Sequence, residues 1–430
     1  MRLLVFKTSQ LEIKEELMEK TKPFEISKNV FVLAFKRVKA NRGSYGIDEQ
    51  TITKYEENLK ENLYRLWNRM SSGTYFPKPV KAVEIPKKNG GTRVLGIPTV
   101  EDRVAQMVAK IYFEPQVEKI FYPDSYGYRP NKSAIEAIGI ARERCWRKDW
   151  VLDFDIKGLF DNIRHDYLIA MVKRHTSCKW IILYIERWLK TPFVMPNGVI
   201  KERTAGTPQG GVISPVLANL FLHYVFDDYM SREFSSIPYE RYADDGVTHC
   251  VSLNQAKYLI RKLDERFRKF GLELNLDKTK IVYCKDDDRK ENYENTSFDF
   301  LGYTFRPRGA KNKQGKIFTN FLPGISDKAK KAIRKEVRNW KLQLRPDASI
   351  NDIARIFNSK IQGWINYYSK YYKTECYGVW RYVNRCLVKW AWKKYKNINS
   401  RKRAVKWLNE IALRDKNLFA HWKIGILPAV

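Results

Sequence analysis

Two acidic stretches decide the fold of this sequence, namely Leu152-Asp-Phe-Asp-Ile-Lys-Gly-Leu-Phe-Asp-Asn162 and Arg241-Tyr-Ala-Asp-Asp-Gly246. The first lies in Trp150–Ile156, where acidic and apolar residues alternate as they do along a strand. The second lies within Tyr239–Val251, which is predicted to form a hairpin with Asp244-Asp245 at its turn. Carboxylates among apolar strand residues are costly to bury, because desolvation opposes their charge. Both stretches therefore need a partner of opposite charge.

A divalent cation is one such partner. Mg²⁺ prefers carboxylate oxygens and substrate phosphates, and two such ions can hold the attacking and departing oxygens of an in-line phosphoryl transfer. The alternative is that these acids form ion pairs with some of the 80 Lys and Arg residues. An Asp-Asp pair alone favours ion pairs, whereas the pair together with a distant acidic strand favours a metal site.

The composition is that of a folded protein without a membrane span. At roughly 100–200 residues per domain, 430 residues allow two to four domains. The 44% apolar content is too high for a disordered chain, and no run of about 18 apolar residues is present. The six cysteines are spaced singly, without a C-x-x-C pair, which indicates reduced thiols in an intracellular protein.

The net charge of +32 favours a polyanionic partner. From Ser326 to Val430 there are 25 basic and 7 acidic residues, so +18 of the charge lies in this last quarter, together with seven of the 12 tryptophans. Basic residues among aromatics can follow a phosphate backbone and stack on bases. The alternative is a solvated helical face over a Trp-rich core, and the total charge favours nucleic acid.

The order of predicted elements indicates a mixed α+β body followed by a helical, basic region. Helices are expected at Thr99–Ile120, after a capping box at Ser133-Ala-Ile-Glu136, and at Asn254–Phe270 before Gly271. A strand is expected at Phe298–Phe305. From Ser326 the pattern is helical to about Leu413.

Eight blocks of the sequence occur in the order typical of one family. They are Asn41-Arg-Gly-Ser-Tyr-Gly-Ile-Asp48, Val83-Glu-Ile-Pro-Lys-Lys-Asn-Gly-Gly-Thr-Arg93, Tyr126-Gly-Tyr-Arg-Pro130, Asp155-Ile-Lys-Gly-Leu-Phe-Asp-Asn162, Gly206-Thr-Pro-Gln-Gly-Gly211, Tyr242-Ala-Asp-Asp245, Phe300-Leu-Gly302 and Gly363-Trp-Ile-Asn-Tyr367. Through these blocks the chain closely resembles the bacterial group II intron reverse transcriptase/maturases from about Asn29 to its end.

The resemblance implies an α+β right-hand polymerase. Residues 28–310 would form the fingers and palm, with an antiparallel palm sheet, and residues 311–430 a helical thumb, or maturase (X), region. Residues 1–27 would be an N-terminal extension. No endonuclease domain is expected, because the chain ends soon after Phe419-Ala-His-Trp422.

The resemblance also implies the metal ligands. It assigns them to Asp155, Asp244 and Asp245, with Ile156 beside them in the metal site, and implies two Mg²⁺ ions, for which Mn²⁺ can substitute. Asp153 lies on the same strand face and is chemically eligible, but the family pattern places the ligand at Asp155.

Five positions match the family's nucleotide pocket. Lys87 and Arg93 would bind the incoming triphosphate, since Lys offers a point charge and Arg a planar fork; alone they would be a solvated hairpin tip. Phe160 would clash with a ribose 2′-OH and so select dNTPs, although plain core packing is the alternative. Gln209 would line the pocket, and Lys278 would lie near the leaving pyrophosphate.

The template–primer contacts are implied by position in the family. Phe300, Leu301 and Gly302 resemble the primer grip, and Arg129 is expected to contact the template or the fold. The helix after Ser326 would lie along the duplex, and its basic residues gather on one face at spacings of three to four. These residues are Lys328, Lys331, Arg334, Lys335 and Arg338.

The resemblance implies an RNA-directed DNA polymerase in a bacterial cytoplasm. Its partners would be an RNA template, expected to be a group II intron RNA, a DNA or RNA primer, and dNTPs. Two alternatives stay open, namely a splicing cofactor that acts by binding its RNA, and a domesticated polymerase used in DNA repair or phage defence. The sequence does not specify the oligomeric state.

Overall fold

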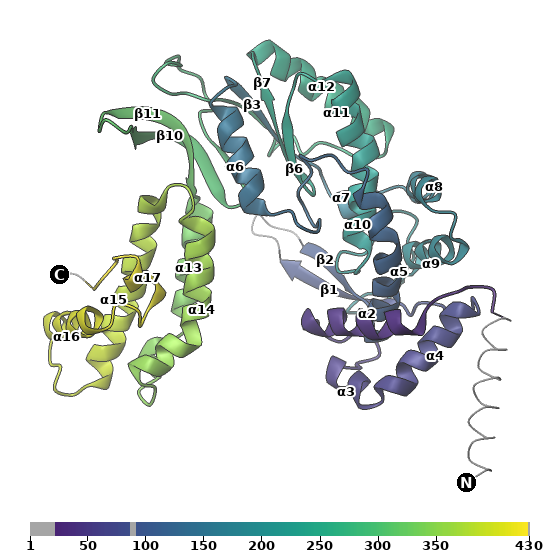
Figure 1. Ribbon diagram of the computed structural model, residues 1–430, viewed down its shortest axis with the longest axis horizontal. Helices are drawn as coiled ribbons and strands as arrows, with labels where there is room; N and C mark the ends of the chain where they lie inside the picture. The colour runs from purple at the N-terminus through teal and green to yellow at the C-terminus, as the bar shows by residue number, and fades with distance from the viewer. Residues whose placement is uncertain (1–21, 87–91, 429–430) are drawn as a thin grey trace, which may run out of the picture.

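The computed structural model describes residues 22–86 and 92–428 of the 430-residue chain. The described chain is organised as two regions (Figure 1). Residues 22–325, here called the body, combine helices with three small sheets, and residues 326–428, here called the bundle, are helical. This arrangement confirms the predicted α+β region followed by a helical one.

The central sheet of the body carries the acidic stretches. It has four strands in the order β6-β7-β3-β8, and each neighbouring pair is antiparallel. The predicted hairpin is present, but Tyr242 pairs with Asp245, so the turn is Ala243-Asp244 and not Asp244-Asp245. The strands are β3 (Trp150–Asp155), β6 (Tyr239–Tyr242), β7 (Asp245–Cys250) and β8 (Lys280–Tyr283).

The central sheet is covered on both faces. Phe154 of β3 packs on Phe226 and Phe267, which lie in the helices on one face of the sheet. Val151 of the same strand packs in a separate cluster with α6 and with the strands that follow β8. The alternation of the strand therefore directs successive side chains into two cores.

A second sheet has the order β2-β1-β4-β5. Strands β1 and β2 are antiparallel, with Pro86 opposite Thr92, as expected for the hairpin in the fingers. The loop that joins them, residues 87–91, lies outside the described residues. The strands are β1 (Val80–Pro86), β2 (Thr92–Ile97), β4 (Phe193–Val194) and β5 (Ile200–Lys201).

The third sheet connects the body to the bundle. Its order is β11-β10-β9, from β9 (Phe298–Phe300), β10 (Tyr303–Lys311) and β11 (Ile317–Ile325). The predicted single strand Phe298–Phe305 is a hairpin, because Leu301 and Gly302 both have positive φ (50° and 80°), as a tight two-residue turn requires. The expected domain boundary at residue 310 falls inside the β10–β11 pair, whereas the core changes at Ile325.

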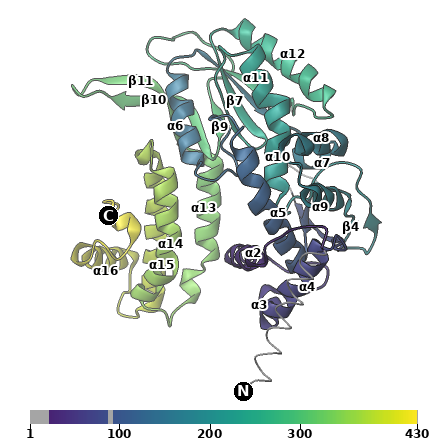
Figure 2. The same cartoon turned by 45° about the vertical axis from the view of Figure 1, so that its right-hand side comes forward.

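The helices of the body surround the sheets (Figures 1 and 2). The predicted helix starts are present, since the hydroxyls of Thr99 and Ser133 accept hydrogen bonds from the first turns of α5 and α6. The helices are α2 (Lys28–Ala40), α3 (Ile52–Glu57), α4 (Leu59–Ser71), α5 (Val100–Glu118), α6 (Ala134–Cys145), α7 (Leu159–Asn162), α8 (His165–His175), α9 (Lys179–Lys190), α10 (Ser214–Leu222), η1 (His223–Asp227), α11 (Asp228–Glu233) and α12 (Leu253–Lys269).

The bundle has its own aromatic core. Trp340, Trp380, Trp390 and Trp422 are buried there, together with Phe357, which stacks on Trp340. The helices are α13 (Asp327–Asn339), η2 (Leu342–Leu344), α14 (Ile350–Tyr368), η3 (Lys373–Cys376), α15 (Tyr377–Lys394), α16 (Arg401–Arg414) and α17 (Ala420–Lys423). The tryptophans are therefore mostly core residues, as one of the two alternatives for this region required.

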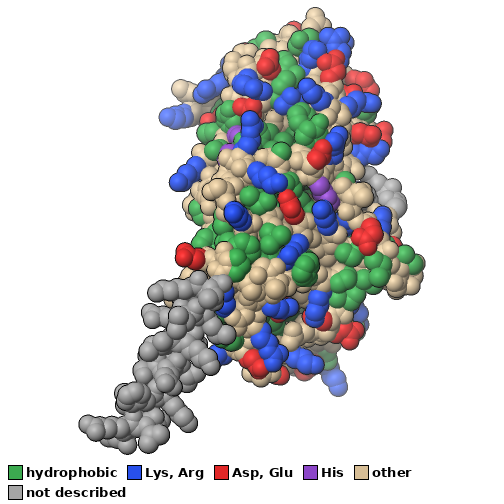
Figure 3. Space-filling model, turned by 90° about the vertical axis from the view of Figure 1, so that its right-hand side faces the viewer, with side chains coloured by type: hydrophobic (Ala, Val, Ile, Leu, Met, Phe, Trp, Pro, Cys, Tyr) green, Lys and Arg blue, Asp and Glu red, His purple; other side chains and the backbone are tan. Residues whose placement is uncertain are grey.

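The surface is basic and mixed. On the face shown in Figure 3, Lys and Arg side chains are spread among acidic and apolar ones.

Of the expected extension 1–27, residues 1–21 lie outside the described residues, and the remainder packs on α4, where Trp67 Nε1 donates to Ile26 O at 2.7 Å. Within residues 22–86 and 92–428, no helix has the length and apolar character needed to cross a membrane.

Candidate active site

The central sheet brings the two acidic stretches together. Asp155 is the last residue of β3 and lies directly opposite Asp245, the first residue of β7. Asp244 precedes Asp245 in the turn, and its carbonyl accepts a hydrogen bond from Ile156 N at 3.3 Å. Backbone pairing therefore fixes three carboxylate-bearing residues at one end of adjacent strands.

The turn that carries Asp244 is held in an unusual conformation. Ala243 has a φ of 58°, in the left-handed region that costs energy for a residue with a side chain. The backbone at Gly127 approaches this turn closely, since a Cβ there would lie 2.4 Å from Ala243 N. Glycine is therefore required at 127, within the Tyr-Gly-Tyr-Arg-Pro block.

A buried arginine, Arg241, supports the same turn. Arg241 forms a two-pronged ion pair with Asp227, with N–O distances of 2.6 and 2.8 Å, and both side chains are fully buried. Its guanidinium also donates to Asn219 Oδ1 at 3.1 Å, to Ser125 Oγ at 2.8 Å and to Ala243 O at 3.2 Å. Asp227, Asn219 and Ser125 thus hold Arg241, and Arg241 holds the turn. The sequence-based prediction missed these positioning residues.

Negative charge accumulates at Asp244 and Asp245. Burial, and then the neighbouring Asp155, raise the pKa of Asp244. Asp245 is open to solvent on one side, yet the surrounding protein atoms and then Asp244 and Asp155 raise its pKa to about 6. Within the described part of the chain, neither carboxylate forms an ion pair with Lys or Arg. These two acids therefore lack the basic partners that the alternative interpretation required.

Asp155 has a different environment. Its Oδ2 accepts hydrogen bonds from Lys278 Nζ and from Asn275 Nδ2, both at 2.9 Å. The bond from Lys278 raises the pKa of that lysine. Asn275 also donates its backbone N–H to Asp155 O at 2.8 Å, so it fixes the end of the strand. Asn275 was not predicted from the sequence.

Asp153 is distinguished from Asp155 by its surroundings. Burial, and then the charge of Asp245, raise the pKa of Asp153 to about 8. A carboxyl group with that pKa carries a proton at neutral pH in the absence of a cation, and a protonated carboxyl is a poor metal ligand. The strand register also separates the two acids, since Asp155 lies opposite Asp245 and Asp153 lies opposite Val247.

The donor set suits a hard divalent cation, although it is not preassembled. The carboxylates of Asp155, Asp244 and Asp245 offer only oxygen, which Mg²⁺ and Mn²⁺ accept. In the described ranges, no three His, Cys, Asp or Glu side chains gather closely enough to hold a metal ion. Only Oδ2 of Asp155 accepts the hydrogen bonds from Lys278 and Asn275, so its Oδ1 is the oxygen without such a contact among the described residues.

Of the residues expected in the nucleotide pocket, Arg93, Gln209 and Lys278 lie in the described part of the chain, and Lys87 does not. Arg93 donates a hydrogen bond to the Gln209 side chain, and Arg93 also lowers the pKa of Asp244 by its charge, so both lie beside the acids. Gly96 N donates to Gln209 O at 2.7 Å. Lys278 contacts Asp155 directly.

Phe160 lies at the start of α7 and is half-buried. Its carbonyl accepts a hydrogen bond from Thr207 N at 2.7 Å, so the loop that carries Gln209 packs against it. A Cβ on Gly206, whose φ is 79°, would lie 2.6 Å from Phe160 O, which explains the glycine. The partly exposed ring is compatible with either role that the sequence left open.

Arg129 is engaged by the fold. Its side chain is only 6% exposed and forms an ion pair with Glu118 at 2.6 Å. It also donates to the carbonyls of Tyr122 and Ser125, both at 2.6 Å. Of the two expected roles, the contacts favour the fold contact over a template contact. The neighbouring Tyr128, which is 52% exposed, faces the site instead, because Asp244 and Asp245 both contribute to its raised pKa after burial.

The expected primer grip is the turn between β9 and β10. Phe300 is buried, so its side chain supports the sheet, while Leu301 and Gly302 form the half-exposed turn. Leu301 O accepts from Tyr367 Oη at 2.8 Å, and Gly302 O accepts from Ser326 N at 3.0 Å. The turn is therefore tied to the start of the bundle.

The basic residues of α13 do not all face one way. Lys331 and Arg338 are exposed, and Lys328 is close enough to Asp245 to lower its pKa. Arg334 is half-buried and leans toward α15, where it lines a cavity. Arg334 borders the buried stripe of α13 that contains Ile333 and Val337, so it lies at the edge of the predicted basic face.

Comparison with known proteins identifies the class. Residues 85–305, slightly more than half of the chain, match the family "Reverse transcriptase (RNA-dependent DNA polymerase)". Residues 330–408 match the "Group II intron, maturase-specific domain". The chain belongs to the reverse transcriptase family. It is an RNA-directed DNA polymerase with a maturase domain, and its α+β fold has an antiparallel central sheet.

Two curated relatives agree with this assignment. The group II intron-encoded protein LtrA of Lactococcus lactis subsp. cremoris is 26% identical over 453 residues, which cover 85% of this chain and 72% of LtrA. Protein YkfC of Escherichia coli (strain K12) is 30% identical over 299 residues, covering 60% of this chain and 74% of YkfC. The structure of telomerase from Candida albicans aligns with a TM-score of 0.44 at 12% identity, covering 87% of this chain and 68% of that one.

Proposed function

We propose that this polymerase extends a primer 3′-OH with dNTPs on an RNA template at Asp155, Asp244 and Asp245. The observation that carries the proposal is the pairing of Asp155 with Asp245 beside Asp244, on strands that are far apart in sequence. Asp244 and Asp245 have raised pKa values and no basic ion-pair partner among the described residues.

Two Mg²⁺ ions, or Mn²⁺ in their place, would be held by Asp155, Asp244 and Asp245, with Ile156 O nearby on the same backbone. When bound, such ions activate the attacking hydroxyl and neutralise charge on the departing oxygen. The raised pKa of Asp244 and Asp245 means that a cation must compete with protons there. Lys278 donates a hydrogen bond to Asp155 Oδ2 and would keep that carboxylate beside the cation site.

The remaining pocket residues would position the nucleotide. Arg93 lies beside Asp244 and would bind the triphosphate together with Lys87, whose predicted role rests on the family pattern alone. Gln209 receives the Arg93 hydrogen bond and would line the base and sugar. Lys278, which lies beside Asp155, would stabilise the leaving pyrophosphate.

The template–primer duplex would lie along the turn Leu301-Gly302 and the exposed side of α13. The turn is fixed to the bundle by two hydrogen bonds, so the primer grip and α13 would move as one unit. Lys331 and Arg338 are exposed on α13 and would contact phosphates, as an A-form hybrid is held by backbone and shape.

The partner RNA would be a group II intron. The match of residues 330–408 to a maturase-specific domain supports assistance to splicing alongside polymerisation. We place the protein in the bacterial cytoplasm because RNA and dNTPs, its expected partners, are available there. The second candidate function, a splicing cofactor with little polymerase role, is favoured by the same match.

The catalytic assignment is tested by Asp244→Asn. Loss of one cation ligand should reduce primer extension on a homopolymer RNA template by roughly 10³-fold or more, while the affinity for RNA changes little. Measurement of extension with and without Mg²⁺, beside RNA binding by anisotropy, checks both. Extension at the wild-type rate would show that Asp244 is not a ligand. Splicing assistance that survives this substitution would separate the second function from the first.

The selectivity assignment is tested by Phe160→Ala. Removing the ring should let ribonucleotides enter, so the ratio of kcat/KM for dNTP over rNTP should fall by about tenfold or more. Phe160→Tyr keeps the ring and should keep the ratio. Unchanged discrimination in the alanine variant, with a normal melting temperature, would make Phe160 a core residue only.

A further inference from the structure

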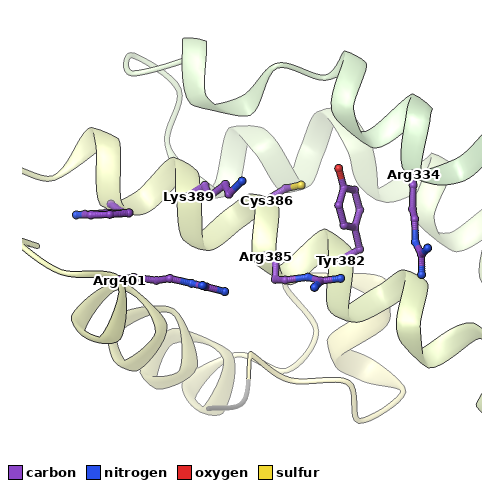
Figure 4. Close-up of a pocket in the computed structure, with 7 residues that line it drawn as sticks. Arg334, Tyr382, Arg385, Cys386, Lys389 and Arg401 are labelled. Atoms are coloured by element: carbon purple, nitrogen blue, oxygen red, sulfur yellow. The ribbon is translucent and has the colours of Figure 1, made fainter. Parts of the chain in front are cut away.

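The bundle contains a basic pocket that the polymerase reaction does not use. Two adjoining cavities, each of about 580 Å³, lie between α13, α15 and α16, and they share Arg334, Arg385 and Arg401. We call the first of them the basic pocket, and the side chains that matter for binding there are Arg334, Tyr382, Arg385, Lys389, Trp392 and Arg401. Figure 4 shows the labelled side chains arriving from three helices, with Arg401 extending toward Arg385.

The cations of this pocket have no counter-charge within the described chain. Of residues 22–86 and 92–428, no acidic one lines either cavity. Among the described residues, Arg334, Arg385, Lys389 and Arg401 form no ion pair. The Nε of Arg334 is buried and has no hydrogen-bond acceptor there.

Arg241 of the body provides a contrast. It is fully buried, and five acceptor atoms of the body satisfy it, including both oxygens of Asp227, whereas Arg385, Lys389 and Arg401 are exposed at the basic pocket. The protein therefore supplies partners to an arginine with a structural role. In the basic pocket the described residues supply no acidic partner, as a site for an external anion requires.

The aromatic residues narrow the class of ligand. Trp392 is 46% exposed at the pocket, and Tyr382 stands beside Arg385, whose guanidinium lies 5.5 Å from the Tyr382 ring centroid. Arginines bind phosphates through planar forks, and an exposed indole offers a face on which an unpaired base can stack. A phosphate backbone with a free base meets both features.

We propose that the basic pocket binds the phosphodiester backbone of single-stranded RNA, with one unpaired base on Trp392, at a site separate from the template–primer path. The inference rests on the proposed function, because the pocket lies within residues 330–408, the part that matches a maturase-specific domain. Figures 1 and 2 both place α16 on the side of the bundle away from α2 and α5. RNA bound there would be anchored while the active site is occupied.

The double variant Arg385→Gln/Arg401→Gln tests the site in the full chain. The probe is a fluorescein-labelled single-stranded RNA 20-mer of mixed sequence, and binding is followed by anisotropy at several salt concentrations. Loss of two phosphate contacts should weaken binding about tenfold and reduce the slope of log affinity against log salt by about 1.4. Trp392→Leu should weaken binding roughly fivefold with an unchanged slope.

The matched control removes the same charge from the same region. Lys402 and Lys406 lie on α16, are exposed and do not line either cavity. Lys402→Gln/Lys406→Gln should weaken binding at most threefold. Equal losses in the two double variants would mean that the general positive field binds RNA, and the pocket proposal would fail.

Three further outcomes also decide the proposal. Primer extension at saturating template–primer should keep its wild-type rate in Arg385→Gln/Arg401→Gln, and a matching loss of rate would place the pocket on the template–primer path. Equal weakening toward a single-stranded DNA of the same sequence, or competition by an acidic peptide, would overturn the assignment to RNA. Asp244→Asn, which should bind the probe normally, keeps a failure of the catalytic assignment distinct from a failure of the pocket. If the double variant melts early, Arg401→Gln alone, exposed at the start of α16, replaces it.

Discussion

The body and the bundle bury different kinds of side chain. The body buries charged groups, among them Asp102, Arg103, Asp227, Glu240 and Arg241. The bundle buries large aromatic residues, and its only buried polar residues among those described are Ser326, Asn384 and His421. The surplus basic residues of the bundle remain at its surface.

The difference follows from what each region must hold in place. Carboxylates that bind cations must be fixed against their mutual repulsion, and buried ion pairs such as Arg241–Asp227 can fix a turn at the cost of desolvation. A region that contacts a phosphate backbone needs a well-packed core and basic side chains that are exposed at its surface. The body therefore combines an apolar core with satisfied buried charges, whereas the bundle depends almost wholly on apolar packing.

The largest expected effect is on the buried ion pair of the body. Arg241→Met leaves the Asp227 carboxylate buried without its partner, so the free energy of unfolding should fall by about 3–5 kcal/mol. Urea unfolding followed by circular dichroism measures this loss. The double variant Arg241→Met/Asp227→Leu removes both charges and should recover much of it. If the single and double variants were equally unstable, packing rather than charge would be the cause.

The second effect is the change in folding stability at acidic pH. Buried titratable groups of the bundle and of the body contribute to it with opposite signs. In the bundle, burial lowers the pKa of His421 from 6.5 to about 3. The unfolded chain then binds a proton that the folded bundle does not, so stability falls as the pH decreases from about 6.5 toward 3. Between pH 6.5 and 5 the expected loss is about 2 kcal/mol.

The matched comparison uses a buried acid of the body. Burial raises the pKa of Asp102 from 3.8 to about 6, although Tyr75 and Thr99 hydrogen bonds oppose the shift. The folded body therefore holds a proton that the unfolded chain releases, and this contribution favours folding at low pH and is lost as the pH rises from about 4 through 6. His421→Gln should remove the acid sensitivity of the bundle. Thermal melts at pH 7 and 5 of both proteins test this, and an unchanged pH dependence would contradict it.

The smallest expected changes in stability come from replacing two glycines with alanine. Gly302, in the turn that joins the regions, has a φ of 80°, and a Cβ there would lie 3.3 Å from Tyr368 Oη. Gly302→Ala should therefore cost about 1 kcal/mol. Gly363 is exposed inside α14, and a Cβ added there would meet no atom of the described chain within 4 Å, so Gly363→Ala should stabilise the helix by about 0.5–1 kcal/mol. Melting temperatures that shift in the same direction would refute the distinction.

Much of the site was predictable from local patterns. The strand at Trp150–Ile156, the hairpin at Tyr239–Val251 and the helix before Gly271 each have a periodicity or a terminating residue that acts over a few positions. The position of the turn was wrong by one residue, because the pairing of Tyr242 with Asp245 requires a positive φ at Ala243, where no glycine signals it. The single strand at Phe298–Phe305 was wrong for a similar reason, since a positive φ at Leu301 has no sequence marker.

The supporting residues could not be predicted in this way. Asp227 and Asn219 lie in an apolar helical stretch, and only the packing of that stretch under β6 and β7 pairs them with Arg241. Asn275 meets Asp155 because the segment after α12 returns to the end of β3. Arg334 separates from Lys331 because α15 covers one edge of α13.

The sequence by itself determined the class of polymerase, the acidic residues proposed for its site and the excess of positive charge near the C-terminus, because motifs, periodicity and charge are local or additive properties. Only the tertiary structure decided which side chains satisfy one another: that Lys278 and Asn275 hold Asp155, that Arg241 secures the turn, and that four cations of the bundle face a cavity without acidic partners among the described residues. Such pairings depend on contacts between residues distant in the chain, and those contacts exist only once the cores have packed.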